Sequence, residues 1–251
     1  MRLIHAAADL DTSESFEDGE LDGIFANHPP DLAHVPYSCY QRYNDLEMIE
    51  RSKSFYEQLN KRRTVRSFSN EPVNIEVIEN IIRTAGTAPS GAHTEPWTFV
   101  VVSDNEIKEL LRNIIEEEEE INYRKRMGAQ WTTDLKCLRT DHIKEYLTTA
   151  PYLILVFKQI YRIESNGRRI NHYYNEISTA IAAGILLTAI HNAGLVALTS
   201  TPLNCGPKIK SLLRRPNNEK LLLLIPIGYP GKDALIPDLS RKPLEDIAVF
   251  F

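Results

Sequence analysis

Residues 88–102 have the sequence Ala-Pro-Ser-Gly-Ala-His-Thr-Glu-Pro-Trp-Thr-Phe-Val-Val-Val. Proline, serine and glycine in succession favour a loop whose backbone N–H groups can face a ligand. The run Trp97–Val102 is rich in β-branched and aromatic residues, which predicts a buried strand. The stretch therefore indicates a core strand that directly follows a ligand-contacting loop, although its composition also fits an ordinary connection.

Helix and strand patterns alternate on both sides of this stretch. Apolar residues at helical spacing predict helices over residues 46–60, 73–87, 105–127, 173–193 and 207–213. Aliphatic and β-branched runs predict further strands over residues 151–157, 194–198 and 221–227. The helix at 173–193 has little polar face, which indicates a place in the core or in a subunit interface.

The composition of the 251-residue chain limits its partners. A net charge of -5 argues against nucleic acid, because phosphate binding needs a concentrated basic surface. The three cysteines are too few and too scattered for a disulfide framework or a zinc site, and the seven histidines have no metal-ligand spacing. The glycine motifs of dinucleotide and nucleotide binding and the zinc-protease motif do not occur. We therefore expect neither a metal nor a nucleic-acid partner.

Both ends of the chain differ from its middle. Residues 9–22 contain seven acids and no base, which predicts a flexible arm. We expect residues 1–45 to form this arm and an extended segment, residues 46–230 the folded domain, and residues 231–251 an extension across a partner subunit. The pattern of a signal peptide or membrane helix is not visible. The sequence as given thus predicts a soluble, cytoplasmic protein, and a membrane anchor in a longer form stays open.

A basic cluster follows the first predicted helix. Arg62, Arg63, Thr64 and Arg66 can give a phosphate several charge-assisted hydrogen bonds, some of them bidentate. The same four residues also fit a solvated basic turn. Alone, the cluster does not decide between these two interpretations.

Two later segments also suit ligand binding. Thr199-Ser-Thr-Pro-Leu-Asn-Cys-Gly206 places three hydroxyl residues at the end of a core strand, where α/β-type folds usually contact ligands. An ordinary turn before a helix would have the same composition. The last core strand ends in Pro226-Ile-Gly-Tyr-Pro230, and Arg241-Lys-Pro-Leu244 follows about ten residues later.

In this order, the four segments resemble the nitroreductase family of flavoproteins, where an Arg-Arg-Ser/Thr-x-Arg run holds FMN. The resemblance covers residue 46 to the C-terminus. It implies an α+β nitroreductase fold with a central mixed β-sheet flanked by helices, in a domain-swapped homodimer. It also implies that Thr201 is catalytic, with its hydroxyl at flavin N5. The FMN-binding residues that it implies are Arg62, Arg63, Thr64, Arg66, Ser90, Gly91, Thr199, Ser200, Thr201 and Arg241.

Longer strings, among them SGAHTEPW and EEEEEINYRKRMG, resemble a branch of this family that removes iodide from 3-iodotyrosine and 3,5-diiodotyrosine. Glu119 and Tyr123 are four residues apart and share a helix face. The resemblance assigns Glu119 to the substrate ammonium, and Tyr123 with Lys144 to its carboxylate. It places the backbone N–H of Ala92 at the phenolate.

The resemblance further implies that NADPH reduces the flavin, directly or through a separate reductase. The flavin then passes the electrons to the substrate. A broad flavin-dependent nitro- or quinone reductase would share every FMN residue but would not need Glu119, Tyr123 and Lys144. A non-catalytic halotyrosine- or flavin-binding module would keep the pocket without redox cycling. The intact Thr201 argues against that module.

Overall fold

The computed structural model describes His28 and residues 31–251. The chain divides into two units, Met1–Tyr40 and Gln41–Phe251. The acidic segment predicted to be a flexible arm lies outside the described residues. In the first unit, the rings of Tyr37 and Tyr40 lie 6.3 Å apart. All the helices and strands below belong to the second unit.

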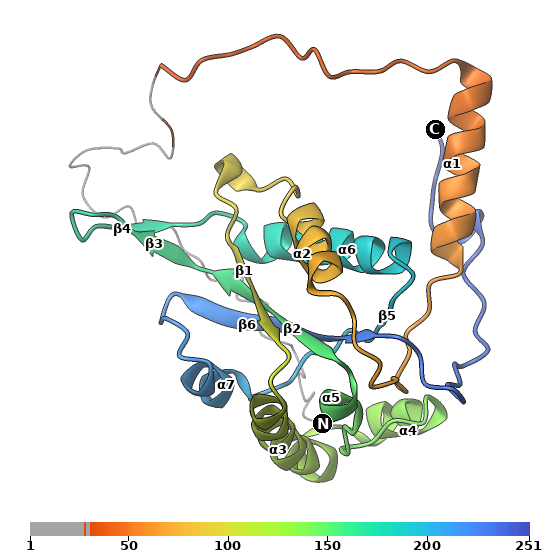
Figure 1. The fold of residues 1–251 in the computed structure, drawn as a ribbon, viewed down its shortest axis with the longest axis vertical. Coiled ribbons are helices and arrows are strands. Elements are labelled where there is room, and N and C mark those ends of the chain that lie inside the picture. Colours follow the sequence, from red (N-terminus) through yellow and green to blue (C-terminus); the bar gives the residue numbers. More distant parts are fainter. Residues whose placement is uncertain (1–27, 29–30) are drawn as a thin grey trace, which may run out of the picture. The chain divides into compact units, whose positions relative to one another are not determined.

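A four-stranded sheet forms the centre of the second unit (Figure 1). Its order is β1 (Trp97–Val102), β2 (Tyr152–Gln159), β6 (Glu219–Gly228) and β5 (Val196–Ala197), and each neighbouring pair is antiparallel. The parallel component is an isolated bridge between Thr64 and Ala197 at the β5 edge. The predicted α+β fold is confirmed, and the parallel pairing of its mixed sheet comes from this bridge.

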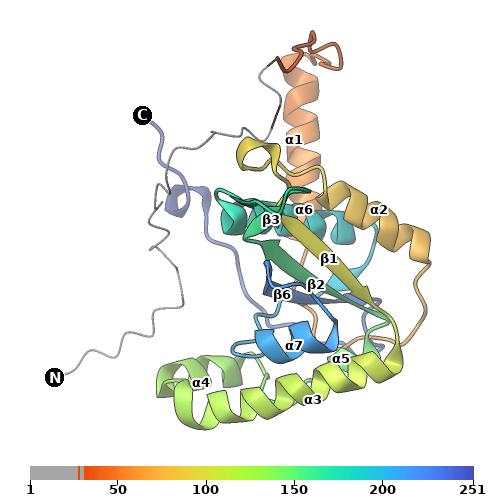
Figure 2. The same cartoon turned by 90° about the vertical axis from the view of Figure 1, so that its left-hand side faces the viewer.

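Helices cover both faces of the sheet (Figure 2). On one face α2 (Ile75–Ala85) and α6 (Asn175–Asn192) pack against Ile154 and Val156 of β2. On the other face α3 (Asn105–Ile121), α5 (Tyr146–Thr149) and α7 (Gly206–Leu212) pack against the alternate residues of the same strand, Leu153, Leu155 and Phe157. Because β2 is buried on both faces, its sequence is a continuous apolar run instead of an alternating one.

The predicted helices and strands are present, with ends that differ by a few residues. The remaining elements are α1 (Asp45–Asn60), α4 (Ala129–Cys137), the hairpin β3 (Tyr161–Ile163) and β4 (Arg169–Asn171), the 3-10 turns Gly91–His93 and Leu244–Asp246, and the π-helical turn Asn122–Arg126. The hairpin, α4 and α5 were not predicted, because their elements are short and mostly polar. In the part of the chain that the structure describes, no helix has the length and apolar character to cross a membrane.

An ion pair between Arg215 and the buried Glu219 lies at one end of the sheet and gives a first testable prediction. Glu219 is 2% exposed, and it accepts hydrogen bonds of 2.7 Å from the Arg215 guanidinium and the Thr98 hydroxyl. Burial raises the pKa of Glu219, but these hydrogen bonds outweigh it and hold the pKa below 4.5. The stabilisation is therefore complete above about pH 4.5 and is lost as the pH falls through the lower, folded-state pKa.

Glu219→Gln removes the charge and keeps the shape. We expect it to lower the free energy of unfolding by about 1–2 kcal/mol at pH 7, a value reduced by the partial exposure of Arg215. The difference should shrink as the pH falls below the pKa of the wild-type carboxyl, because both proteins then carry a neutral side chain. Urea unfolding of both proteins at pH 7 and under acid measures this, and equal stability at pH 7 would contradict it.

Candidate functional site

The segment after α1 lies beside the β5 edge of the sheet. The N–H of Val65 donates to the carbonyl of Ala197 at 3.2 Å, and the side chains of Val65 and Phe68 are buried in the core. Two apolar anchors therefore fix this extended segment. The residues between and before them, Arg62, Arg63, Thr64 and Arg66, are left half-buried at the surface, where a ligand can reach them.

Arg62, Arg63 and Arg241 lie close together, and the guanidinium contacts of Arg63 and Arg241 go to backbone carbonyls. The guanidinium of Arg241 donates to the backbone carbonyl of Arg62 at 2.8 Å, and that of Arg63 donates to the carbonyl of Pro237. Burial, and then repulsion from Arg241, lower the pKa of Arg62. In His28 and residues 31–251, neither Arg66 nor these three arginines forms a salt bridge with a carboxylate.

A cavity of about 270 Å³ adjoins this cluster, and its wall includes Arg62, Arg63, His191 and Ala197. Cations that are held together without a counter-ion favour an anionic ligand, because the ligand relieves their repulsion. The arrangement thus fits the phosphate group of a cofactor better than a solvated turn. The sequence alone could not distinguish these two interpretations.

The hydroxyl segment Thr199–Thr201 follows β5. The backbone of Ser200 exchanges two hydrogen bonds with Leu224 of β6, at 2.9 and 2.8 Å, and this pairing fixes the segment to the sheet. Thr199 and Thr201 are exposed on either side of it. The half-buried Tyr146 of α5 contacts Ser200 through its hydroxyl.

Three predicted substrate residues lie together, although Lys144 comes from a different segment than Glu119 and Tyr123. The ammonium of Lys144 lies 4.0 Å from a carboxylate oxygen of Glu119 and 5.5 Å from the ring centre of Tyr123. Glu119 and Lys144 are only 8% and 7% exposed. Burial lowers the pKa of Lys144, while Glu119 and Asp141 oppose that shift. We call Glu119, Tyr123 and Lys144 the charged clamp.

Hydrogen bonds fix Lys144 of the charged clamp, and Arg66 of the basic cluster lies near it. The backbone N–H of Lys144 donates to Glu116 at 2.6 Å, and its ammonium donates to the carbonyl of Asp141. Burial, and then the charges of Glu119 and Asp141, raise the pKa of Tyr123, and the nearby positive charge of Arg66 opposes that shift. One chain therefore brings together the clamp, Arg66 and the segment that contains Ser200.

The loop of Ser90, Gly91 and Ala92 lies far from the cavity that Arg62 and Arg63 line. The N–H of Gly91 donates to the hydroxyl of Ser178 at 3.3 Å, near the first turn of α6, whereas His191 at the other end of α6 lines the cavity at Arg62. Thirteen residues of helix separate Ser178 from His191, about 20 Å along its axis. Figure 1 shows the same separation, with the segment between α2 and β1 at the end of α6 that is remote from β5.

Backbone geometry sets this loop apart. Ala92 adopts the left-handed conformation, with φ 49 and ψ 30, which few residues other than glycine adopt. A Cβ atom on Gly91 would lie 2.9 Å from the backbone oxygen of Tyr173, so the loop and the start of α6 approach too closely for any larger residue. Such strain is often found at ligand-contacting positions.

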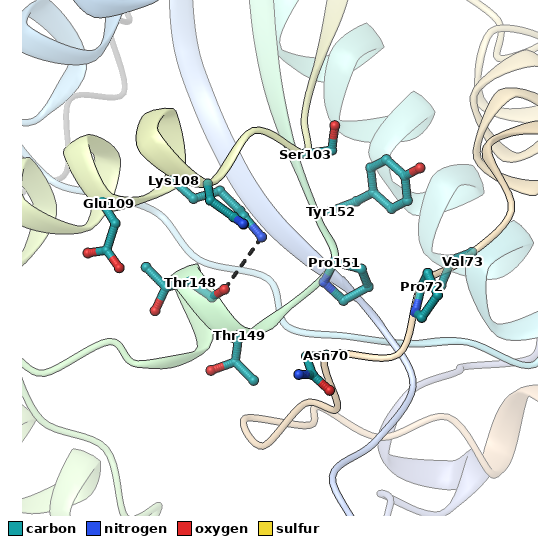
Figure 3. A pocket seen from close by; sticks show the side chains of 11 residues that line it. Asn70, Pro72, Val73, Ser103, Lys108, Glu109, Thr148, Thr149, Pro151 and Tyr152 are labelled. Atoms are coloured by element: carbon teal, nitrogen blue, oxygen red, sulfur yellow. Dashed lines mark hydrogen bonds between the residues drawn. The ribbon is translucent and has the colours of Figure 1, made fainter.

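A different hollow, of about 610 Å³, contains none of the predicted residues (Figure 3). The buried Lys108 on its wall donates to the carbonyls of Ala150 and Thr148, at 3.1 and 3.4 Å, and so caps the end of α5. Burial lowers the pKa of Lys108, and the charges of Asp104 and Glu109 oppose that shift. Two backbone carbonyls already bind its ammonium, so the hollow is not the candidate site.

Asn122 and Tyr146 touch the site but were not predicted from the sequence. Asparagine near a helix end usually faces solvent, and a tyrosine in a short helical turn usually packs against the core. The spacing of three residues between Glu119 and Asn122 was the available indication that they share a face.

Comparisons with known proteins match the part of the chain that contains the candidate site. A family model described as "Nitroreductase family" matches residues 59–229. Human iodotyrosine deiodinase 1 is 60% identical over 242 residues, which cover 96% of this chain and 83% of the human one. Iodotyrosine deiodinase of Hydra vulgaris is 60% identical over 217 residues, covering 86% and 79% of the two chains.

A solved structure of oxidised iodotyrosine deiodinase, bound to FMN and 3-iodo-L-tyrosine, is 30% identical in sequence. The two structures superpose with a TM-score of 0.66, and the match covers 76% of this chain and 96% of that one. The family model spans every predicted site residue except Arg241, which lies in the C-terminal segment.

Proposed function

Since the chain belongs to the nitroreductase family, and within it to the iodotyrosine deiodinases, we propose that it removes iodide reductively from 3-iodotyrosine and 3,5-diiodotyrosine with FMN as cofactor. In each turnover a C–I bond is replaced by a C–H bond, two electrons and one proton enter, and iodide leaves. The observation that carries the proposal is the charged clamp, in which Glu119 and Lys144 are buried 4.0 Å apart beside Tyr123.

The clamp suits a zwitterionic amino acid. Without substrate, Glu119 and Lys144 face each other at the outer limit of an ion pair. A substrate amino acid supplies an ammonium for Glu119 and a carboxylate for Lys144 and the Tyr123 hydroxyl, so that one long pair is replaced by two shorter ones. Because both side chains are nine-tenths buried, these interactions gain strength from the low local dielectric. A neutral nitroarene or quinone cannot use them.

The residues around the basic cluster fit FMN. We propose that Arg62, Arg63 and Arg241 hold its phosphate, since these cations otherwise repel one another. Bound FMN supplies the electrons for cleavage of the C–I bond. The other cofactor contacts that we propose are Thr64, Arg66, Ser90, Gly91, Thr199, Ser200 and Thr201, with the Thr201 hydroxyl at flavin N5.

The separation of the Ser90–Ala92 loop supports a homodimer. One chain holds this loop about 20 Å along α6 from the arginines, so we propose that each site takes the loop from the partner subunit. There the backbone N–H of Ala92 would donate to the substrate phenolate. Apolar side chains suited to such an interface remain exposed on α1, α6 and the C-terminal segment: Leu46, Ile49, Phe55, Ile177, Ile181, Ile247, Val249 and Phe250.

The C-terminal segment 231–251 then has a second role. Its Arg241 binds back to Arg62 of the same chain, while the apolar residues beyond Leu244 stay exposed. We propose that these residues lie across the partner subunit. We also propose that the electrons come ultimately from NADPH, directly or through a separate reductase, in keeping with the resemblance to flavin reductases.

Anaerobic mixing tests the proposed function. We expect the purified protein to be yellow and to release FMN on denaturation, not FAD, because the site offers arginines for one phosphate and no adenylate motif. After reduction with dithionite, addition of diiodotyrosine should reoxidise the flavin, with one iodide released for each flavin oxidised. Absorbance and an iodide electrode measure the two products. A colourless protein that takes up no FMN would overturn the proposal, and reoxidation by quinone but not by diiodotyrosine would indicate a general reductase.

A further inference from the structure

We propose that Asn122 is a positioning residue, which orients the Glu119 carboxylate for the substrate ammonium and ties it to the loop that follows Thr201. The inference rests on the proposed function. Asn122 is 1% exposed, and its side-chain amide donates to Glu119 at 3.4 Å. A buried carboxylate needs such donors to remain charged and fixed in one direction.

The backbone at Asn122 places its side chain toward Glu119. α3 ends at Ile121, and Asn122 begins a π-helical turn in which its carbonyl accepts from the N–H of Met127 at 2.8 Å. Single π-helical turns within helices often occur at functional sites. Because Glu119 precedes Asn122 by three residues, the two side chains lie on the same face.

The orientation of the Asn122 amide is fixed from its oxygen side. That oxygen accepts from the guanidinium of Arg126 at 2.9 Å and from the side-chain amide of Asn204 at 3.4 Å. An amide oxygen accepts two hydrogen bonds, so both of its places are filled. The opposite orientation would point the NH2 group at two donors. The NH2 group must therefore face Glu119.

Asn204 connects Asn122 to the segment that contains Thr201. It lies three residues after Thr201 in the exposed turn before α7, and its φ of 62 holds it in the left-handed conformation. Through Asn122, this turn is linked to the carboxylate that receives the substrate. Binding of the ammonium at Glu119 is thus sensitive to the position of the segment that contains Thr201.

The test measures diiodotyrosine affinity by flavin fluorescence in the FMN-loaded protein. We expect Asn122→Ala to weaken binding about threefold to tenfold, the effect of one moderate hydrogen bond. In a Glu119→Gln background the same substitution should have no further effect, because it acts through that carboxylate. Affinity for 3-(4-hydroxy-3-iodophenyl)propionate, which lacks the ammonium, should be unchanged. Asn113→Ala, on the exposed side of α3, is the matched control and should behave as wild type.

A second variant keeps the test decisive if Asn122→Ala does not fold. Asn204→Gly removes an exposed side chain, and glycine adopts the required positive φ without strain. It removes one of the two hydrogen bonds that fix the Asn122 amide, so we expect about a twofold loss of diiodotyrosine affinity that is absent in the Glu119→Gln background. Wild-type affinity in both variants, or a loss shared equally by the propionate, would overturn the inference. Failure of the wild type to bind iodotyrosine would instead overturn the proposed function.

Discussion

Glu119→Gln is expected to weaken diiodotyrosine binding about tenfold to hundredfold, because a hydrogen bond to a charged group contributes about 1.5–3 kcal/mol. Glutamine keeps the shape of the side chain and the helix propensity of α3 but cannot neutralise the substrate ammonium. Lys144, 4.0 Å away, would also lose its buried counter-charge. Titration of flavin fluorescence with diiodotyrosine measures the change.

The same variant should leave other properties of the enzyme intact. FMN affinity should not change, because the basic cluster around Arg62 and Arg63 belongs to the segment after α1 and does not include Glu119. Reduction of a neutral quinone should also persist, since it needs no ammonium site. Lys208→Ala is the matched control. Lys208 lies on α7 and pairs with the exposed Glu117, which belongs to the same acidic run as Glu119. Equal iodotyrosine affinity in wild type and Glu119→Gln would exclude Glu119 from the site.

The core of the fold was predictable because its apolar patterns are strong. Residues 151–157 are apolar throughout, and this strand is covered on both faces, so pattern and burial agree. The hairpin of β3 and β4 was not predicted, because each strand has only three residues and Arg162 and Arg169 interrupt any apolar run. The four residues of α5 are likewise too few to show a helical period.

The sequence predicts the candidate site as a set of residues but does not show how they are arranged. Arginines and hydroxyls in short runs indicate anion binding wherever the fold places them. By contrast, Lys144 lies 25 residues after Glu119, and sequence spacing does not show that the two side chains meet inside the protein. The separation of the Ser90–Ala92 loop from the arginines depends on the length of α6 and its position across the sheet, which only the folded chain reveals.

That separation leads to the last prediction, which concerns heterodimers of two defective subunits. One subunit carries Arg62→Ala with Arg63→Ala. Its affinity for FMN should fall about a hundredfold or more, because two charge-assisted contacts are removed. The other carries Gly91→Ala, whose new Cβ would meet the backbone oxygen of Tyr173 at 2.9 Å and displace the loop. A displacement of about 1 Å at a substrate-positioning group can cost on the order of a hundredfold in rate.

A heterodimer purified through two different affinity tags should recover activity that neither parent has. If each site combines the arginines of one chain with the Ser90–Ala92 loop of the other, one site in the heterodimer carries all the substitutions and the second carries none. Activity per dimer should then reach about half that of wild type. A homodimer that carries all three substitutions in both chains is the inactive control. If each chain instead built a complete site, both sites of the heterodimer would be defective, and its deiodinase activity would stay as low as that of the parents.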